Sequence, residues 1–574
     1  MGQLRSGWLA VWATLVWACH GAAGLASAPL PSPYHPADMV LWSGKIVTLD
    51  AQSRVAEALA IRDGRIVAVG SNQEMVRWIG PQTRVIDLAG RTVIPGLIDS
   101  HFHGIRAGIT YTAELDWSGV RSLEEALATI REAARQSPAG TWIVVAGGWH
   151  EAQLRERRGP TPAELTEAAP DHPVYVQHLY QYAVLNAKAM ERLGLNRDTP
   201  DPPMGRYQRD ANGNLTGVVT GNITTFTYFY DRLPKAAVDE QVASTKAFFR
   251  QLNRLGLTGF IDAAGSGILP EHYDAVYRLW RSGQLTLRVR YYINPQVRGK
   301  EMEELQERTS FLRSRTGDDM LRFEGFGEAL LWETHDGTNY GLKLAFSADA
   351  KEKLYQIAGM AAERGLGIQA HATNDYSARQ FLDVFERVNR EVPIAGLRWY
   401  IVHLEDLTAE TMDRLKALGM GISVQDRLYF DGDRYLRVMG EPAARRAPPI
   451  RTALRAGLVV GAGTDAHRVA PYNPFVSLWW LVTGKSVSGR VIRGPEETPT
   501  REEALRMYTW NSAWLSGEET TRGSLEVGKW ADLVVLSKDY FTVPEDEIRE
   551  IESVLTMVGG RVVYASDWFR PLER

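Results

Sequence analysis

Short apolar runs of strand length recur along this chain, and each one ends in polar side chains. The clearest run extends over residues 92–98 and leads into Asp99-Ser100-His101-Phe102-His103. Three later runs have the same form and end in His371, His403 and Asp465. Each of the three follows a helical pattern. Alternating helices and buried strands, with polar groups only at the carboxyl ends of the strands, are typical of a parallel α/β barrel enzyme. We therefore expect these side chains to converge at the mouth of a barrel.

The first of these motifs indicates a metal site. Side chains two positions apart on a strand share a face, so His101 and His103 point the same way. Two neutral imidazoles on one face are good ligands for zinc or a related divalent ion. A lone histidine at a strand end is more often a hydrogen-bonded structural residue. Four histidines in matching contexts, together with Gly463-Thr464-Asp465, favour metal binding instead.

Both ends of the chain beyond this region alternate apolar and polar residues around glycine turns. The patterns over residues 38–48, 58–70, 528–536 and 554–564 predict short strands, and Asp63-Gly64 is a hairpin signal. Neither end has enough strands to enclose a core alone. We therefore expect the two ends to pair into one composite β-sandwich.

Composition fits a large enzyme and excludes several other classes. The 574 residues are 44% hydrophobic and 23% charged, and the formal net charge is -4, which gives no bulk electrostatic case for binding nucleic acid. The sequence contains neither a Gly-x-x-x-x-Gly-Lys-Ser/Thr phosphate loop nor a Gly-x-Ser-x-Gly nucleophile elbow. Nucleotide binding and serine hydrolase chemistry therefore have little support, and we expect a small-molecule substrate.

The first residues have the pattern of a targeting segment. Arg5 supplies a positive start, and residues 8–18 are almost wholly apolar but short for a membrane span. We therefore predict a signal peptide over residues 1–28, an exported protein that is periplasmic or secreted, and no integral membrane segment in the mature chain. The single cysteine, Cys19, lies inside this segment, so the mature chain would have no thiol. Lipidation at Cys19 is the less favoured alternative, because Trp17 fits a lipoprotein cleavage box poorly.

These motifs together resemble the amidohydrolase superfamily, and most closely its family 3, which also has a loop like Gly147-Gly148-Trp149. The resemblance covers nearly the whole mature chain. It implies an α/β fold in which a (β/α)₈ TIM barrel carries a small composite β-sandwich. The expected boundaries are a signal peptide at 1–28, sandwich segments at 36–94 and 516–570, and a metal-dependent hydrolase barrel at 95–515.

The resemblance also implies the ligand set, one or two divalent ions, with zinc expected. One ion would be held by His101, His103 and Asp465, and a second by His371 and His403. Two cations close together need an anionic group between them.

The family places a carboxylated lysine, or sometimes a glutamate, between the two ions at the end of the fourth strand. The matching segment here places Glu328 at this position, and Lys343 is the rival bridging residue.

The expected activity follows from this ligand set. Asp465 would accept a proton from the attacking water and pass it to the leaving nitrogen, and His403 or His371 would help to polarise the carbonyl. We therefore expect a metal-dependent amidohydrolase that cleaves a non-peptide carbon-nitrogen bond in a small amide, cyclic amide or formamide-like molecule. The alternatives are a deaminase or an ester or lactone hydrolase on the same site, and a catalytically idle binding barrel.

Substrate recognition is less well defined by the sequence. Trp149 is expected to shape the pocket wall, and His467 either lines the pocket or caps a loop. The family usually has aspartate where this chain has His150, and often histidine where it has Gln181, so its usual substrate contacts are in doubt. Asp99 would either orient a ligand imidazole or cap the following loop. Trp479 and Trp480 are expected to be barrel packing, and a homo-oligomer is possible.

Overall fold

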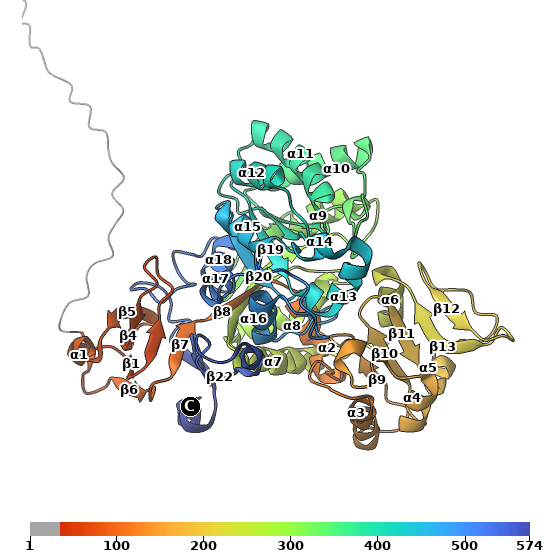
Figure 1. Cartoon of the computed structure of the whole chain (residues 1–574), viewed down its shortest axis with the longest axis horizontal. Coiled ribbons are helices and arrows are strands. Elements are labelled where there is room, and N and C mark those ends of the chain that lie inside the picture. Colours follow the sequence, from red (N-terminus) through yellow and green to blue (C-terminus); the bar gives the residue numbers. More distant parts are fainter. Residues whose placement is uncertain (1–34, 574) are drawn as a thin grey trace, which may run out of the picture. The chain divides into compact units, whose positions relative to one another are not determined.

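Eight parallel strands build the largest sheet of the computed structural model, which describes residues 35–573 (Figure 1). Neighbouring strands pair in the order β8, β14, β15, β16, β17, β18, β19 and β20, and β20 contacts β8, so the sheet is nearly closed. Their bounds are β8 (Leu97–Phe102), β14 (Leu257–Asp262), β15 (Arg288–Ile293), β16 (Leu321–Phe326), β17 (Gly367–Ala372), β18 (Tyr400–His403), β19 (Gly421–Gln425) and β20 (Val460–Gly463). The predicted α/β barrel is confirmed.

Helices follow these strands and bury one apolar stripe each. In α11 (Asp375–Glu391) the buried residues Phe381, Phe385 and Val388 recur at helical spacing, and the Asn374 side chain caps the helix by accepting from the Ser377 amide. The other helices between barrel strands are α7 (Val238–Arg254), α8 (Asp274–Arg281), α9 (Glu301–Thr309), α10 (Ala348–Glu363), α12 (Ala409–Ala417), α13 (Arg427–Met439), α14 (Glu441–Ala444) and α15 (Ile450–Arg455). After β20 come α16 (Pro474–Thr483), α17 (Arg501–Met507) and α18 (Trp510–Leu515), and Trp479 and Trp480 of α16 are buried as expected.

The two ends of the described chain form two further sheets around a shared apolar core, which confirms the predicted composite β-sandwich. One sheet has the order β5, β4, β1, β6 and the other β23, β22, β21, β7, β2, β3. Their bounds are β1 (Met39–Trp42), β2 (Lys45–Val47), β3 (Val55–Ala56), β4 (Ala58–Arg62), β5 (Arg65–Gly70), β6 (Arg84–Asp87), β7 (Thr92–Pro95), β21 (Leu533–Leu536), β22 (Ser553–Val558) and β23 (Arg561–Ala565). Strands from both ends meet where β21 pairs with β7.

The pattern over residues 92–98 predicts a single strand, but the structure has two strands in this region. β7 belongs to the sandwich and β8 to the barrel, and Gly96 lies between them. A Cβ atom on Gly96 would lie 2.2 Å from Oγ1 of Thr258, so this crossing has room only for glycine. The crossing allows His101 to lie in the barrel strand itself rather than in a loop.

The chain between β8 and β14 forms a separate five-stranded sheet, which the sequence analysis did not distinguish from the barrel. Its strand order is β12, β13, β11, β10, β9. We call this region the inserted unit; its elements are α3 (Leu123–Gln136), β9 (Ile143–Val145), α4 (Pro162–Ala168), β10 (Val174–His178), β11 (Tyr182–Leu185), α5 (Ala187–Arg192), β12 (Arg206–Arg209), β13 (Leu215–Thr220) and α6 (Ile223–Tyr230). Barrel helix α2 (Gly104–Thr110) precedes it and packs against α7.

The predicted signal peptide and Cys19 lie outside the described residues. Within residues 35–573, no helix combines the length and the apolar character needed to cross a bilayer.

Candidate metal centre

The polar residues at the ends of the barrel strands lie together, because the carboxyl ends of parallel strands share one edge of the sheet. His101 lies in β8 and His103 directly follows it, while His371 lies in β17 and His403 ends β18. The two carboxylates come from loops, Glu328 after β16 and Asp465 after β20. The four histidines and Asp465 are buried, and the Glu328 side chain is 11% exposed.

Their ligand atoms form overlapping groups of metal-binding size. The atoms of three sets lie within 4.8 Å of one another: His101, His103 and Glu328; His101, His403 and Asp465; and Glu328, His371 and His403. Oδ1 of Asp465 lies 3.0 Å from Nε2 of His103 and 3.5 Å from Nε2 of His101. The structure thus brings all six predicted ligands into one cluster.

Glu328 lies between the two predicted ion positions. Its Oε1 atom is 3.6 Å from Nε2 of His103, and its Oε2 atom is 2.8 Å from Nδ1 of His371 and 3.2 Å from Nε2 of His403. Oε2 also lies 3.7 Å from Nε2 of His101, so the Glu328 carboxylate contacts histidines of both groups, which is the placement that a bridging ligand needs. Lys343, the rival, is exposed in the loop before α10.

The donor set fits a divalent metal ion on two further observations. Nε2 of His101 is buried and has no hydrogen-bond partner among the described residues, although it is surrounded by ligand atoms. A buried polar nitrogen without a partner is costly, and a cation would satisfy it. The mixture of imidazole and carboxylate ligands suits zinc or a similar ion.

In three of the imidazoles, the ring nitrogen that faces away from the metal centre has its own partner, which holds the ring in the orientation that ligation requires. Nδ1 of His101 lies 2.9 Å from Oε1 of Gln369, and Nδ1 of His103 donates to the Ala264 carbonyl at 2.8 Å. His371 is turned the other way, because its Nε2 atom lies 3.1 Å from the Gly337 carbonyl oxygen and 3.2 Å from Oδ1 of Asp336, which leaves Nδ1 facing Glu328. Such partners fix the tautomer and raise ligand basicity.

Asp336 is a residue that the sequence analysis missed. It lies in the loop between β16 and α10, in the His335-Asp336 pair a few residues after Glu328. Both its carboxylate oxygens also accept from the Thr373 amide, at 3.1 and 3.0 Å. The sequence signal that could have indicated Asp336 is an acidic residue in the loop that follows the bridging ligand.

Asp99 joins β8 to the segment after β20, which is neither of the two roles expected of it. Its carboxylate accepts from Oγ1 of Thr464 at 2.7 Å, from the Thr464 amide and from the His101 amide. These bonds tie the segment before Asp465 to β8. Burial raises the pKa of Asp99 to about 7.

The electrostatics of the centre favour anionic carboxylates. Burial opposes ionisation of Glu328 and Asp465, yet the neighbouring histidines hold the pKa of both groups well below the usual range. Burial also opposes protonation of His371, but Glu328 and Asp336 raise its pKa to about 10. The cluster without metal is therefore organised to hold positive charge.

The two predicted substrate-binding residues occupy different surroundings. Trp149 is fully buried, packs against Trp117 and His178 and donates from its indole nitrogen to the Gln177 carbonyl at 2.8 Å. It belongs to an apolar cluster with Trp117, Val145 and Val176. Nε2 of His467 instead lies 3.0 Å from Oε2 of Glu114, which lines a cavity beside the centre.

The positions that depart from the family pattern also lie near one another. His150 stacks on Phe430 of α13, and Nε2 of Gln181 donates to Oδ1 of Asp431 at 3.4 Å. These contacts join the inserted unit to the helix that follows β19. Sequence reasoning did not predict this juxtaposition, because it depends on how the inserted unit folds over the barrel.

Comparison with known proteins agrees with this geometry. The chain is 28% identical over 541 residues to an N-substituted formamide deformylase of Arthrobacter pascens, covering 92% of this chain and 98% of that protein. It is also 28% identical over 550 residues to the protein LONG AFTER FAR-RED 3 of Arabidopsis thaliana, covering 92% of each. A solved metal-dependent hydrolase of Pyrococcus horikoshii OT3, described as uncharacterized, shares the fold with a TM-score of 0.64 at 23% identity, covering 88% of this chain and 99% of that one. The model of one family, described as the amidohydrolase family, matches residues 84–564, and the chain therefore belongs to the amidohydrolase family.

Proposed function

We propose that this protein hydrolyses a non-peptide carbon-nitrogen bond of a small amide, with N-substituted formamides as the substrate class to test first. The observation that carries the proposal is the placement of Glu328 between two groups of histidines, with Asp465 facing His101 and His103. The full-length similarity to an N-substituted formamide deformylase supports the choice of substrate.

The six clustered residues would hold two metal ions. His101, His103 and Asp465 would hold one divalent ion, His371 and His403 a second, and Glu328 would bridge them. Zinc is the ion we expect, because imidazole and carboxylate donors are its usual ligands in hydrolases. When bound, such ions acidify water and polarise a carbonyl group.

Asp465 is placed to move the proton. Its pKa lies well below the usual range, despite burial, because the imidazoles of His101 and His103 lie against its carboxylate, so it is an anion at neutral pH. In the proposed reaction a water oxygen bonds to the carbonyl carbon, and Asp465 accepts the water proton. It then donates that proton to the nitrogen as the carbon-nitrogen bond breaks, which releases an amine and a carboxylic acid.

The ring of His403 is placed to act as a neutral group. Burial and the neighbouring cations Arg427 and His371 lower its pKa well below the usual value. A neutral imidazole suits both metal ligation and contact with a carbonyl oxygen.

Turnover of a panel of amides by the metal-loaded protein tests the proposal. The panel contains N-substituted formamides, a cyclic amide, an aminopyrimidine and a lactone, with formate, amine, ammonia and acid release measured separately. Amine and formate in equal amounts from the formamides support the proposal. Ammonia from the aminopyrimidine alone, or acid from the lactone alone, would assign the site to deamination or ester hydrolysis. Stoichiometric metal with no turnover at all would favour an idle binding barrel.

A further inference from the structure

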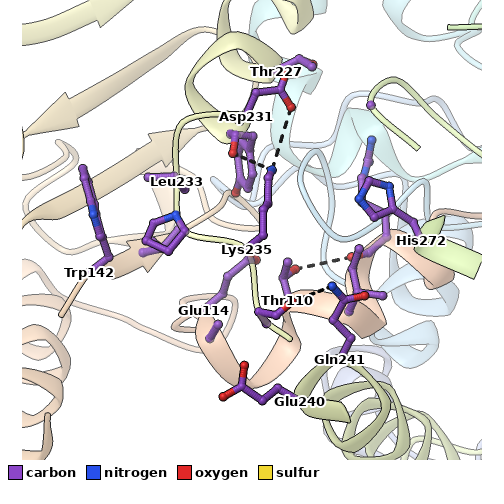
Figure 2. A pocket seen from close by; sticks show the side chains of 18 of the residues that line it. Thr110, Glu114, Trp142, Thr227, Asp231, Leu233, Lys235, Glu240, Gln241 and His272 are labelled. Atoms are coloured by element: carbon purple, nitrogen blue, oxygen red, sulfur yellow. Dashed lines mark hydrogen bonds and ion pairs between the residues drawn. The ribbon is translucent and has the colours of Figure 1, made fainter. Parts of the chain in front are cut away.

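A cavity of about 430 Å³ lies between the barrel and the inserted unit (Figure 2). Its walls come from α2, from the loop after β14, and from α6 with the segment that joins it to α7. Apolar side chains, including Trp142, Leu233 and Ile268, form much of the surface. None of the roles assigned above uses this space.

The cavity is lined by residues that follow two ligands of the metal centre along the chain. Arg106 follows the ligand His103 by three positions, and Arg468 follows Asp465 by three positions. A Cβ atom on Gly265 would lie 3.0 Å from Nη1 of Arg106 and equally close to Nδ1 of His103, so the guanidinium and the ligand imidazole flank the same glycine. Arg106 therefore lies on the Nδ1 side of His103, while Nε2 of the same ring faces Asp465.

The inner end of the cavity carries donors that the protein does not use. Arg106 and Arg468 are 6% and 5% exposed, and the buried Nε atom of each has no hydrogen-bond partner within residues 35–573. The Arg468 guanidinium lies 3.6 Å from the centre of the Tyr230 ring, and the Tyr230 hydroxyl is also buried without a partner. Buried charges are ordinarily paired, because an unpaired one is costly.

The charges that line the cavity leave an excess of one cation. Arg106, Arg192, Lys235 and Arg468 face three carboxylates, those of Glu114, Asp231 and Glu240. At the rim, Nζ of Lys235 lies 3.9 Å from Oδ1 of Asp231 and donates to the Tyr230 carbonyl, and Figure 2 shows these side chains on the wall.

At the inner end Glu114 is engaged by His467, whose Nε2 atom lies 3.0 Å from Oε2 of the carboxylate. The two inner guanidiniums, those of Arg106 and Arg468, therefore line the cavity together with one carboxylate, that of Glu114.

We propose that the cavity binds a carboxylate group of the substrate, so that the hydrolysed amide carries a carboxylate held by Arg106 and Arg468 and an apolar part against Trp142 and Leu233. This inference rests on the proposed amide hydrolysis. Guanidinium groups match carboxylate geometry with paired hydrogen bonds, and one excess cation matches one carboxylate. The apolar walls suit an organic acid better than a free inorganic anion.

Matched substrate pairs test the assignment. ω-Formamido carboxylates of increasing chain length are compared with their primary amides, which have nearly the same shape but no charge. We expect wild-type kcat/KM to be at least about tenfold higher for the best carboxylate than for its amide, and Arg468→Met and Arg106→Met to remove that preference. Arg192→Met is the matched control, because Arg192 is an exposed rim residue, and it should leave the ratio within about twofold. An unchanged preference in both inner variants would overturn the proposal.

A binding measurement separates this inference from the proposed reaction. Calorimetric titration of the metal-loaded protein with phenylacetate, phenylacetamide and inorganic phosphate needs no turnover. We expect phenylacetate to bind wild type and Arg192→Met alike, and at least about tenfold more weakly to Arg468→Met. Equal binding to Arg468→Met would place the carboxylate on the metal ions, and tighter binding of phosphate would exclude an organic acid; either result overturns the proposal. Circular dichroism and metal content of each variant check that the fold and the centre are intact.

Discussion

Nε2 of His371 lies 3.2 Å from Oδ1 of Asp336, on the side of the ring opposite to Glu328. Nε2 also donates to the Gly337 carbonyl at 3.1 Å, and Nδ1 is turned towards Glu328, so the imidazole lies between two carboxylates. This arrangement makes Asp336 a positioning residue, which acts on the metal centre through His371.

Asp336→Asn should weaken metal binding without removing a ligand. Loss of such a partner typically costs about 10- to 100-fold in metal affinity, because the ligand imidazole loses both its orientation and part of its basicity. Competition titration with a zinc indicator measures the affinity of each site. The control is Asp349→Asn, since Asp349 is an exposed residue of α10. Unchanged affinity in Asp336→Asn would show that the backbone alone orients His371.

Glu328→Gln should reduce the metal content from close to two ions to about one per chain. Glutamine keeps the size of the side chain but loses the charge that offsets repulsion between two cations. Elemental analysis of purified protein gives the ion count. Glu333→Gln, in the same loop and half-exposed, is the matched control, and Lys343→Ala tests the rival bridging residue. Full metal content and activity in Glu328→Gln, with loss in Lys343→Ala, would transfer the bridging role to Lys343.

Asp465→Asn should lower kcat by about a thousandfold or more while much of the metal remains bound. The amide can still contact an ion through its oxygen, but it cannot accept the proton that the reaction must transfer. Steady-state kinetics on the best formamide, together with metal analysis of the same sample, separate these effects. Asp413→Asn on the exposed side of α12 should leave kcat unchanged. Wild-type turnover by Asp465→Asn would exclude the proposed proton transfer.

The ligands could be predicted from the sequence because their placement depends on local signals. His101, His371 and His403 each lie in or at the end of an apolar strand. A parallel barrel brings such strand ends together, and this does not depend on the conformation of the loops. Asp336 and Arg468 could not be predicted in the same way. Their positions depend on loop paths, and the role of Arg468 appears only when α6 of the inserted unit brings Tyr230 against it.

The division of one apolar run into β7 and β8 was hidden for a related reason. Residues 92–98 are continuous in hydrophobicity, so their pattern does not show where the chain passes from one sheet to another. Only the close approach of Thr258 to Gly96, which is a contact between distant parts of the chain, marks the crossing.

Metal removal should lower the thermal stability of the protein. The six ligands are gathered on loops and strand ends of the folded barrel, so metal binds the folded state and stabilises it in proportion to the logarithm of metal concentration over the dissociation constant. Thermal unfolding followed by circular dichroism should show a Tm several degrees lower after chelation, and the wild-type Tm should return when zinc is added. A chelator already saturated with zinc is the control for direct effects of the chelator. The variant with both His101→Ala and His103→Ala should respond much less, because it lacks two ligands of one group. An equal fall in Tm for this variant and for wild type would show that the stabilising metal lies elsewhere in the protein.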